Sequence, residues 1–448
     1  MNVETDTARE RTRAPAIGLG VAVALIVLAV ALPPLLGWNV HVRSFPPLHA
    51  EWLPRVGPGT LPAVALAVCA AVYGVDVAAR ARWRWLLAGS CVVGAAWLAS
   101  LATVDGLDGI GVILDTPYEY LETARAVTDF PATLREYVSR IPLDAPHNWP
   151  VHLAGHPPGA LLFFVVLVQL GLGSGLAAGF VVLLVGATTP VAVLLLLRRL
   201  DAEEWARRAA PFLVMGSAAI WMAVSADGMF AAFAAWGLCA LGYSATAGTR
   251  GATAAWGVAA GLLLGYCVML SYGLPLLGIL ALAVLLIART WQPLPWAVGA
   301  ALAVVLAFAA LGFAWWEAYP VLVDRYWDGI ASRRPAAYWV WGDLAALAVS
   351  AGPMVGPAVA MALQRGIRLR RLEAGERVIV LLALAAVLTV LLADLSQMSK
   401  AEVERIWLPF VPWLLLGTAL LPERWRRAGF AGQLGFALLV QHLLATGW

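Results

Sequence analysis

Long apolar runs separated by short polar connections are the main pattern of this chain. A helix that spans the hydrocarbon core of a bilayer needs about 20 apolar residues. Thirteen stretches approach that length, so we expect membrane-spanning helices near residues 15–37, 60–79, 85–104, 176–197, 209–225, 229–246, 254–270, 273–288, 296–314, 338–363, 378–394, 406–421 and 428–447. The pattern predicts an all-α polytopic membrane protein with a single domain, residues 1–448.

A further apolar stretch, residues 157–172, is shorter and ends in the glycine-rich segment 171–175. If both this stretch and 176–197 crossed the membrane, the arginines that follow would lie on the wrong side. We therefore interpret 157–172 as a re-entrant or juxtamembrane helix. Irregular backbone at membrane depth must be surrounded by protein or by a water-filled cavity, so we expect a cavity beside it.

The composition excludes several classes of protein. Of the 448 residues, 62% are hydrophobic and 13% are charged, whereas about a quarter of the residues in a soluble domain are charged. The net charge is only +3. A soluble enzyme, a disordered chain and a nucleic-acid-binding protein are therefore excluded, and membrane lipids are the expected surroundings.

Arginines set the expected orientation, because positively charged residues stay on the cytoplasmic side during membrane insertion. Of the thirty basic residues, twenty lie in clusters near 9–13, 80–84, 198–208, 365–377 and 424–427 or at Arg250 and Arg289. These positions mark the cytoplasmic side of the cell membrane and place the N-terminus there. The loops that then face the outside are 38–59, 105–156, 315–337 and 395–405.

The four cysteines lie within apolar runs and lack the spacing of a disulfide framework or a zinc site. We interpret them as small buried hydrophobic residues. The sequence indicates no metal-binding cluster and no cofactor, and it leaves a requirement for a divalent cation open.

The long outer loop 105–156 carries eight acidic and three basic residues and offers three candidate catalytic carboxylates. Asp105 and Asp108 follow a helix at the outer boundary, where a carboxylate can act as the general base for an acceptor hydroxyl. Solvated turn residues would give the same pattern. Glu119 stands between Tyr118 and Tyr120, whose rings suit a sugar, although an amphipathic surface helix also explains this segment.

The outer loop ends in His156-Pro-Pro-Gly159, which predicts a helix start because proline is tolerated in the first turn. Free N–H groups at a helix N-terminus favour an anion such as phosphate. His156 is therefore a candidate for binding a phosphate, and a purely structural hydrogen bond is the alternative.

Asp227 lies between two apolar helices with almost no loop around it. A charge so close to the membrane is costly unless it faces water or a partner. We therefore include Asp227 among the candidate site residues, with capping of the following helix as the alternative.

The segment 394–410 has the highest charge density on the predicted outer face. Lys400 and Arg405 can together neutralise a phosphate, and Glu402 and Glu404 would support them. Pairing of Lys400 with Glu404 along a helix is the simpler alternative. The loop 315–337 adds tryptophans and tyrosines and the further cations Arg325, Arg333 and Arg334.

The chain resembles actinobacterial membrane glycosyltransferases of the GT-C superfamily, most of all the methylthioxylose transferases. The similar segments are the acidic outer loop, His156-Pro-Pro-Gly159, Ser225-Ala-Asp227, Ser271-Tyr272-Gly273 and Lys400-Ala-Glu-Val-Glu-Arg-Ile-Trp407. The resemblance covers roughly residues 100–413. It implies a GT-C-like fold and a reaction on the extracytoplasmic face.

The resemblance also implies a polyprenyl-phosphate sugar donor and a cell-envelope glycan or glycolipid acceptor, with methylthioxylose and a lipoarabinomannan-type glycan as the specific pair. The catalytic carboxylate of the family falls on Asp105 or a neighbour, but the acidic pair of many members is here separated by Gly106-Leu107. Tyr272 would support the site. Because polyprenyl phosphate is a good leaving group, the reaction needs a base and cations but no general acid.

A secondary transporter or a lipid-linked-sugar flippase is the alternative function. Transporters carry charges near the bilayer midplane on broken helices, whereas the ionisable residues here gather at the outer boundary. Pro275, Pro353 and Pro357, within predicted helices, keep this alternative open.

Overall fold

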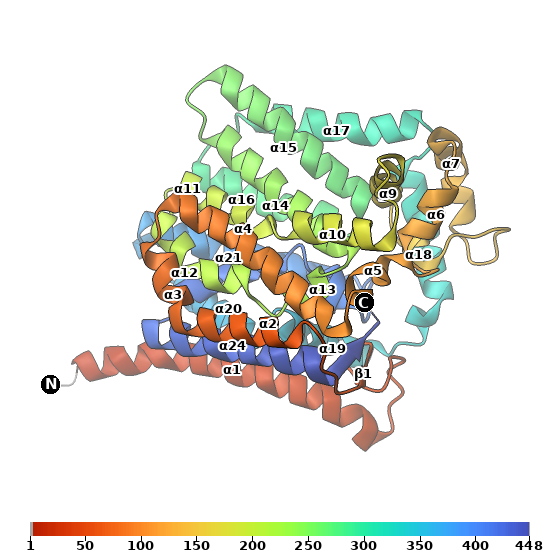
Figure 1. The fold of residues 1–448 in the computed structure, drawn as a ribbon. Helices are drawn as coiled ribbons and strands as arrows, with labels where there is room; N and C mark the ends of the chain where they lie inside the picture. The colour runs from red at the N-terminus through yellow and green to blue at the C-terminus, as the bar shows by residue number, and fades with distance from the viewer. Residues whose placement is uncertain (1–2, 448) are drawn as a thin grey trace.

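The computed structural model describes residues 3–447, with side chains from Arg13 onward, and it is nearly all-α (Figure 1). The chain begins with α1 (Val3–Leu36), β1 (Ala50–Trp52) and α2 (Thr60–Cys69). A π-helical turn joins α2 to α3 (Val75–Arg80), and α4 (Trp83–Ala102) follows. The outer loop contains the short helices α5 (Asp108–Gly111), α6 (Tyr120–Ala126), α7 (Phe130–Tyr137) and α8 (Val151–Ala154).

The rest of the chain is a series of helices that ends in a short strand. These elements are α9 (Gly159–Gln169), α10 (Gly175–Gly186), α11 (Thr189–Arg199), α12 (Glu203–Val214), α13 (Ala219–Met222), α14 (Ala226–Ala245), α15 (Arg250–Leu270), α16 (Leu277–Ala288), α17 (Leu294–Ala310), α18 (Trp315–Asp328), α19 (Ala336–Ser350), α20 (Val355–Gly366), α21 (Ala374–Leu395), α22 (Val403–Ile406), α23 (Val411–Leu415), α24 (Glu423–Leu443) and β2 (Leu444–Thr446).

By length and composition, seven of the described helices could cross a membrane, or up to nine if each of two bent pairs is one span. The bent pairs are α17–α18, with an angle of 75°, and α19–α20, with an angle of 107°. The expected count of thirteen spans is not confirmed. The prediction of one continuous helix over 209–225 is wrong, because the chain breaks between α12 and α13 at Met215–Ala218.

The short helix α9 confirms that 157–172 is too short to cross a bilayer alone, since its 11 residues extend only about 17 Å. Its first half is buried, and it packs against α6 and α15. Gly159 allows this approach, because a Cβ at that position would lie 2.4 Å from the carbonyl oxygen of Met269. Protein therefore packs closely against the first half of the segment, whereas Val166 and Leu170 in its second half are exposed.

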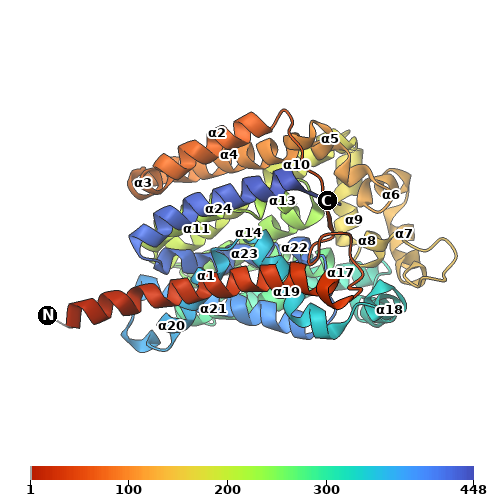
Figure 2. The same ribbon diagram turned by 90° about the horizontal axis from the view of Figure 1, so that it is seen from below.

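The arginine-rich connections and the predicted outer loops lie at opposite ends of the helical bundle (Figures 1 and 2). The connections after α3, α11 and α20 are at the end where α1 begins. The helices α5, α6, α7 and α18 and strand β1 are at the other end. The separation of charge that the sequence predicts is thus present in the fold.

Two contacts tie the ends of the chain to the bundle. Helix α1 packs against α20, where Gly18 faces Gly356 so closely that a Cβ on Gly18 would lie 2.4 Å from the Gly356 carbonyl oxygen. Strands β1 and β2 form an antiparallel pair with Ala50 opposite Thr446. The sequence did not predict these strands, because three residues are too few to show alternation.

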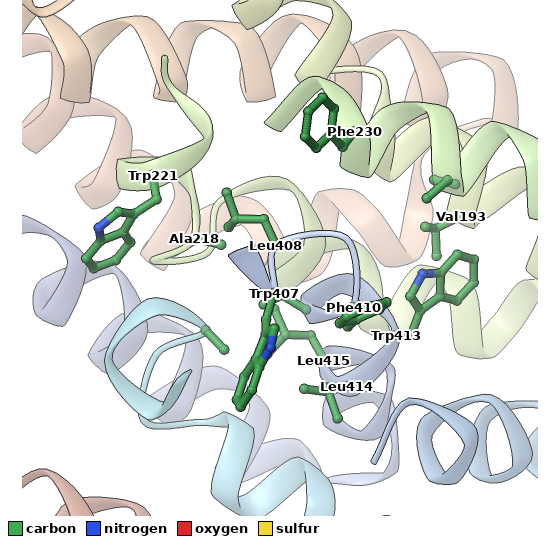
Figure 3. Close-up of a cluster of buried hydrophobic side chains, with 14 of the residues drawn as sticks. Val193, Ala218, Trp221, Phe230, Trp407, Leu408, Phe410, Trp413, Leu414 and Leu415 are labelled. Atoms are coloured by element: carbon green, nitrogen blue, oxygen red, sulfur yellow. The ribbon is translucent and has the colours of Figure 1, made fainter. Parts of the chain in front are cut away.

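The segment after α22 is anchored in the hydrophobic core. Trp407, Leu408 and Phe410 are almost fully buried, and they lie among side chains from α13 and α14 such as Trp221 and Phe230 (Figure 3). These side chains fix the position of α22, a helix of only four residues that carries Arg405.

Candidate functional site

A buried polar cluster is formed around Arg405 by residues from distant parts of the chain. One guanidinium nitrogen of Arg405 donates to Asp227 Oδ2 at 2.9 Å, and the other lies 3.1 Å from His152 Nε2 and 3.6 Å from Glu402 Oε2. Arg405 and Asp227 are each about 2% exposed. Their ion pair is therefore strengthened by a low-dielectric environment.

His152 connects Arg405 to Glu119. The Nδ1 atom of His152 lies 2.6 Å from Glu119 Oε1, while its Nε2 atom faces Arg405. Because arginine can only donate, Nε2 must accept and the ring proton must be on Nδ1, from which it is donated to Glu119. In this arrangement His152 bridges Arg405 and Glu119 and orients the Glu119 carboxylate. Glu119 Oε2 is buried and has no hydrogen-bond partner among the described residues.

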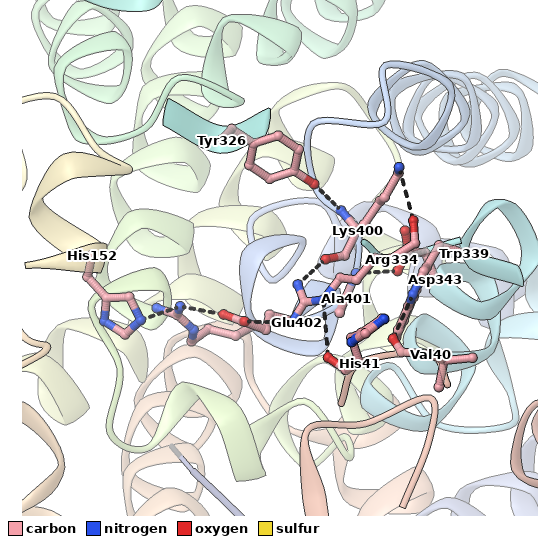
Figure 4. A network of polar contacts seen from close by, with 11 residues as sticks. Val40, His41, His152, Tyr326, Arg334, Trp339, Asp343, Lys400, Ala401 and Glu402 are labelled. Atoms are coloured by element: carbon pink, nitrogen blue, oxygen red, sulfur yellow. Dashed lines mark hydrogen bonds and ion pairs between the residues drawn. The ribbon is translucent and has the colours of Figure 1, made fainter. Parts of the chain in front are cut away.

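A second arginine extends the cluster on the opposite side of Glu402 (Figure 4). Arg334 Nη2 lies 3.4 Å from Glu402 Oε1, and its Nη1 donates to the carbonyl oxygen of Lys400. The Glu402 carboxylate thus lies between the guanidinium groups of Arg334 and Arg405. Its side chain is 24% exposed, compared with 3% for Asp227.

The backbone at Glu402 is unusual. Ala401 and Glu402 both have positive φ angles, 66° and 62°, a left-handed conformation that costs a residue with a Cβ about 1–2 kcal/mol. Ala401 N–H donates to Asp343 Oδ1 at 2.9 Å, which holds the turn in place. The strained turn directs the Glu402 side chain between the two arginines.

The electrostatics of the cluster favour the charged forms of Glu119, Glu402 and Arg405. Burial alone would raise the pKa of Glu119, but His152 and Arg405 outweigh it and lower the pKa. Likewise, burial opposes the charge of Glu402, yet Arg405 and Arg334 lower its pKa. Burial lowers the pKa of Arg405, but the surrounding carboxylates outweigh it and raise that pKa. The cluster thus brings three carboxylates together with two guanidinium groups.

The sequence analysis offered two roles for Asp227, a site residue or a cap of the following helix. In the structure Asp227 is not the cap. The side chain of Ser225 caps α14 by accepting from Gly228 N–H. Asp227, in the first turn of α14, is therefore left to pair with Arg405.

His156 lies three residues before the first residue of α9, Gly159, and Pro158 is the N-cap of this helix. Its Nδ1 is 2.7 Å from the carbonyl oxygen of His152, and its ring packs near Tyr120 and Phe230. Burial lowers the pKa of His156. These contacts give it a structural hydrogen bond at the edge of the cluster.

Asp105 and Asp108 lie outside the cluster around Arg405. Asp105 Oδ1 forms an ion pair with Arg55 at 2.7 Å, and its side chain is 41% exposed. Arg55 N–H donates to the carbonyl oxygen of His442, so Asp105 belongs to the part of the outer end where residues near β1 and β2 meet α4. Asp108 is exposed at the start of α5.

The remaining predicted residues are Lys400, Glu404 and Tyr272. Lys400 directs its ammonium group to the carbonyl oxygens of Ala331 and Arg334 and over the ring of Trp327, and not toward Arg405. Glu404 is fully buried on α22. Tyr272 packs with the aromatic rings of α18.

The sequence analysis did not identify two members of the cluster as main site residues. His152 was not singled out, although its spacing of four residues from His156 places two imidazoles on one short stretch. Arg334 was only a further candidate cation. Among the side chains described from Arg13 onward, no group of three or more His, Cys, Asp or Glu is placed to hold a metal ion.

Comparisons with protein-family models and with curated proteins find no match for this chain. The apolar helices and the buried cluster define the class that the structure supports, a helical protein with several segments suited to a membrane.

Proposed function

We propose that this chain is a GT-C-type membrane glycosyltransferase with about thirteen crossings, which transfers a sugar from a polyprenyl-phosphate donor to a glycan or glycolipid acceptor on the extracytoplasmic face. The observation that carries the proposal is the buried cluster of carboxylates and guanidinium groups around Arg405. It lies toward the end of the bundle opposite the arginine-rich connections, which belong on the cytoplasmic side. Methylthioxylose and a lipoarabinomannan-type acceptor are the pair that the family resemblance favours.

Glu119 is the proposed general base. His152 orients its carboxylate through Oε1, while Oε2 has no hydrogen-bond partner among the described residues and can take the proton of an acceptor hydroxyl. The acceptor oxygen forms a bond to the anomeric carbon as the bond from that carbon to the phosphate oxygen breaks. The polyprenyl phosphate leaves with the electron pair of the broken bond.

Arg334 and Arg405 are the proposed cations for the donor phosphate. Both approach the carboxylate of Glu402, at 3.4 and 3.6 Å, and phosphate oxygens accept hydrogen bonds from guanidinium groups in a similar geometry. Glu402 is the partner that a donor phosphate would displace, because it is the most exposed acid of the cluster. The two arginines would then stabilise the charge that develops on the leaving group.

A transfer assay with purified protein in lipid vesicles and a panel of polyprenyl-phosphate sugars tests the proposal. We expect Glu119→Gln to lower turnover by about 10²–10⁴-fold, since this is the usual effect of losing a general base. Asp105→Asn is the matched variant, because Asp105 is held by Arg55. If Asp105→Asn abolishes transfer while Glu119→Gln does not, the base is Asp105. No transfer from any donor would contradict the proposed reaction.

A lipid-linked-sugar flippase is the second candidate, and the two bent helix pairs favour it, since transporters commonly use broken helices. The two functions differ in product. A transferase forms a new glycosidic bond, whereas a flippase moves an intact labelled lipid from one leaflet to the other. Measuring both in the same vesicles distinguishes them.

A further inference from the structure

A cavity of about 420 Å³ opens in the outer loop, and its volume is within the range of roughly 300–1,000 Å³ that is typical of small-molecule sites. Helices α6 and α7 and the segment before α8 form its walls. Its polar lining consists of three carboxylates, three hydroxyls and one guanidinium group: Glu122, Asp129, Glu136, Thr123, Thr128, Thr133 and Arg140.

The cavity lies on the elements that carry Glu119 and His152. Pro117, two residues before Glu119, and Pro150, two residues before His152, both line it. Helix α6 divides the two regions, since Glu122 and Ala126 face the cavity while the opposite side of the helix is buried. A ligand in the cavity would therefore lie on the other side of α6 from Glu119, against the segments that hold the proposed general base.

The walls of the cavity are held in place before any ligand binds. Asp129 Oδ1 accepts from Ala132 N–H and caps α7. Trp149 Nε1 donates to the carbonyl oxygen of Tyr137, and the Arg140 guanidinium lies over the Trp149 ring at 3.5 Å and donates to the carbonyl oxygen of His147. A preformed site of this kind loses little conformational entropy on binding.

The charges and hydrogen-bonding groups of the lining indicate the class of ligand. Three carboxylates and one guanidinium group give a net charge of −2, which disfavours phosphates and other anions. Carboxylates accept hydrogen bonds from neighbouring hydroxyl groups, and threonine hydroxyls can both donate and accept. A neutral, polyhydroxylated ligand matches this set.

We propose that this cavity binds neutral sugar residues of the glycan acceptor. The inference rests on the proposed glycosyltransferase function and names its acceptor as a neutral oligosaccharide. A cationic ligand such as a polyamine is the competing occupant, because it also matches the negative charge.

Calorimetric titration of the full-length protein in nanodiscs tests this inference. The probes are neutral tetrasaccharides of mannose, glucose and arabinose, with spermidine as the cationic probe. The double variant Glu122→Gln/Glu136→Gln should bind the best tetrasaccharide about tenfold or more weakly, because two charge-assisted contacts are lost. Both side chains are exposed, so the melting temperature should not change.

Two further variants complete the test. Ala126→Trp fills the cavity and should abolish saccharide binding, whereas Asp144→Asn removes an exposed acid of the same loop outside the cavity and should leave it unchanged. The inference is wrong if no tetrasaccharide binds, if the cavity variants bind as well as the wild type, or if spermidine alone binds.

The outcomes separate this inference from the proposed function. If the wild type transfers sugar but the cavity variants keep the acceptor KM, the acceptor binds elsewhere and only the inference fails. If tetrasaccharides bind in the cavity but no donor supports transfer, the cavity is a glycan site and the transferase proposal fails.

Discussion

Glu402 lies between the guanidinium groups of Arg334 and Arg405, in the place proposed for the donor phosphate. We expect Glu402→Gln to raise the affinity for polyprenyl phosphate by about tenfold, since a competing negative charge is removed. Titration of the lipid into nanodisc-embedded protein measures the affinity. Glu423→Gln is the control, because Glu423 also pairs with an arginine, Arg427, but at the opposite end of the bundle. Weaker binding by Glu402→Gln would mean that Glu402 serves only to hold the arginines.

The buried ring of His156 predicts a pH dependence of stability. Burial lowers the pKa of His156 in the folded protein, whereas an unfolded histidine has a pKa of about 6.5. As the pH falls below that value, the unfolded chain gains a proton that the folded protein does not, so stability decreases. The pKa values of Glu119 and Glu402 are lowered in the folded protein. Their contribution to the stability of the protein therefore decreases only when the pH falls below their unfolded pKa of about 4.3.

We therefore expect the melting temperature to fall between pH 7.5 and 5.5, and to fall less in His156→Asn, whose amide can replace Nδ1 as the donor to the His152 carbonyl oxygen. Thermal unfolding followed by intrinsic fluorescence measures both. His147→Asn, at an exposed histidine of the same loop, should behave as the wild type. An equal pH response in His156→Asn would assign the effect to another group.

At the scale of secondary-structure elements, the contact between α1 and α20 depends on glycine. A Cβ at Gly18 would lie 2.4 Å from the Gly356 carbonyl oxygen, whereas nothing lies within 4 Å of a Cβ at Gly20. We expect Gly18→Leu to destabilise the protein by about 1–3 kcal/mol through overpacking and Gly20→Leu to have no such effect. Thermal unfolding of the two variants in detergent compares them. Equal melting temperatures would show that α1 is not held by this contact.

The elements that the sequence predicted best are those with long uninterrupted apolar runs, such as α14, α15 and α21. The break between α12 and α13 was missed because residues 215–218 include a single polar side chain, Ser217, so the apolar run looks continuous in the sequence. Strands β1 and β2 are separated by almost the whole length of the sequence. The pattern of residues within one segment contains no information about so distant a partner.

The same limit applies to the site. Glu119, Asp227, Glu402 and Arg405 were each selected from the sequence, because charges beside apolar segments stand out. Their meeting around His152 depends on the packing of α6, α8, α14 and α22, which are far apart in sequence. Asp105 was also selected from the sequence, but in the structure it pairs with Arg55. Arg55 lies in a loop in which the sequence analysis identified no candidate residue.

At the scale of the whole molecule, the separation of arginines from the outer loops predicts the orientation in the membrane. In a variant with all four cysteines replaced, a cysteine at Ser332 should react with an impermeant thiol reagent added to intact cells. A cysteine at Ile367, which is 86% exposed between α20 and α21, should react only after the membrane is permeabilised. The reverse labelling would place the buried cluster near the cytoplasmic face and contradict the proposed donor and acceptor sides.

The contacts of α1 and β1 also constrain the order of assembly during synthesis. Helix α1 is made before its glycine partner on α20, which follows more than 300 residues later, and β1 is made before its partner β2 at Leu444–Thr446. Chains are made at roughly 5–20 residues per second, so α1 spends tens of seconds without its partner. Helix α1 therefore reaches its final place only after α20 has been made, and a product truncated before α20 would leave α1 undocked.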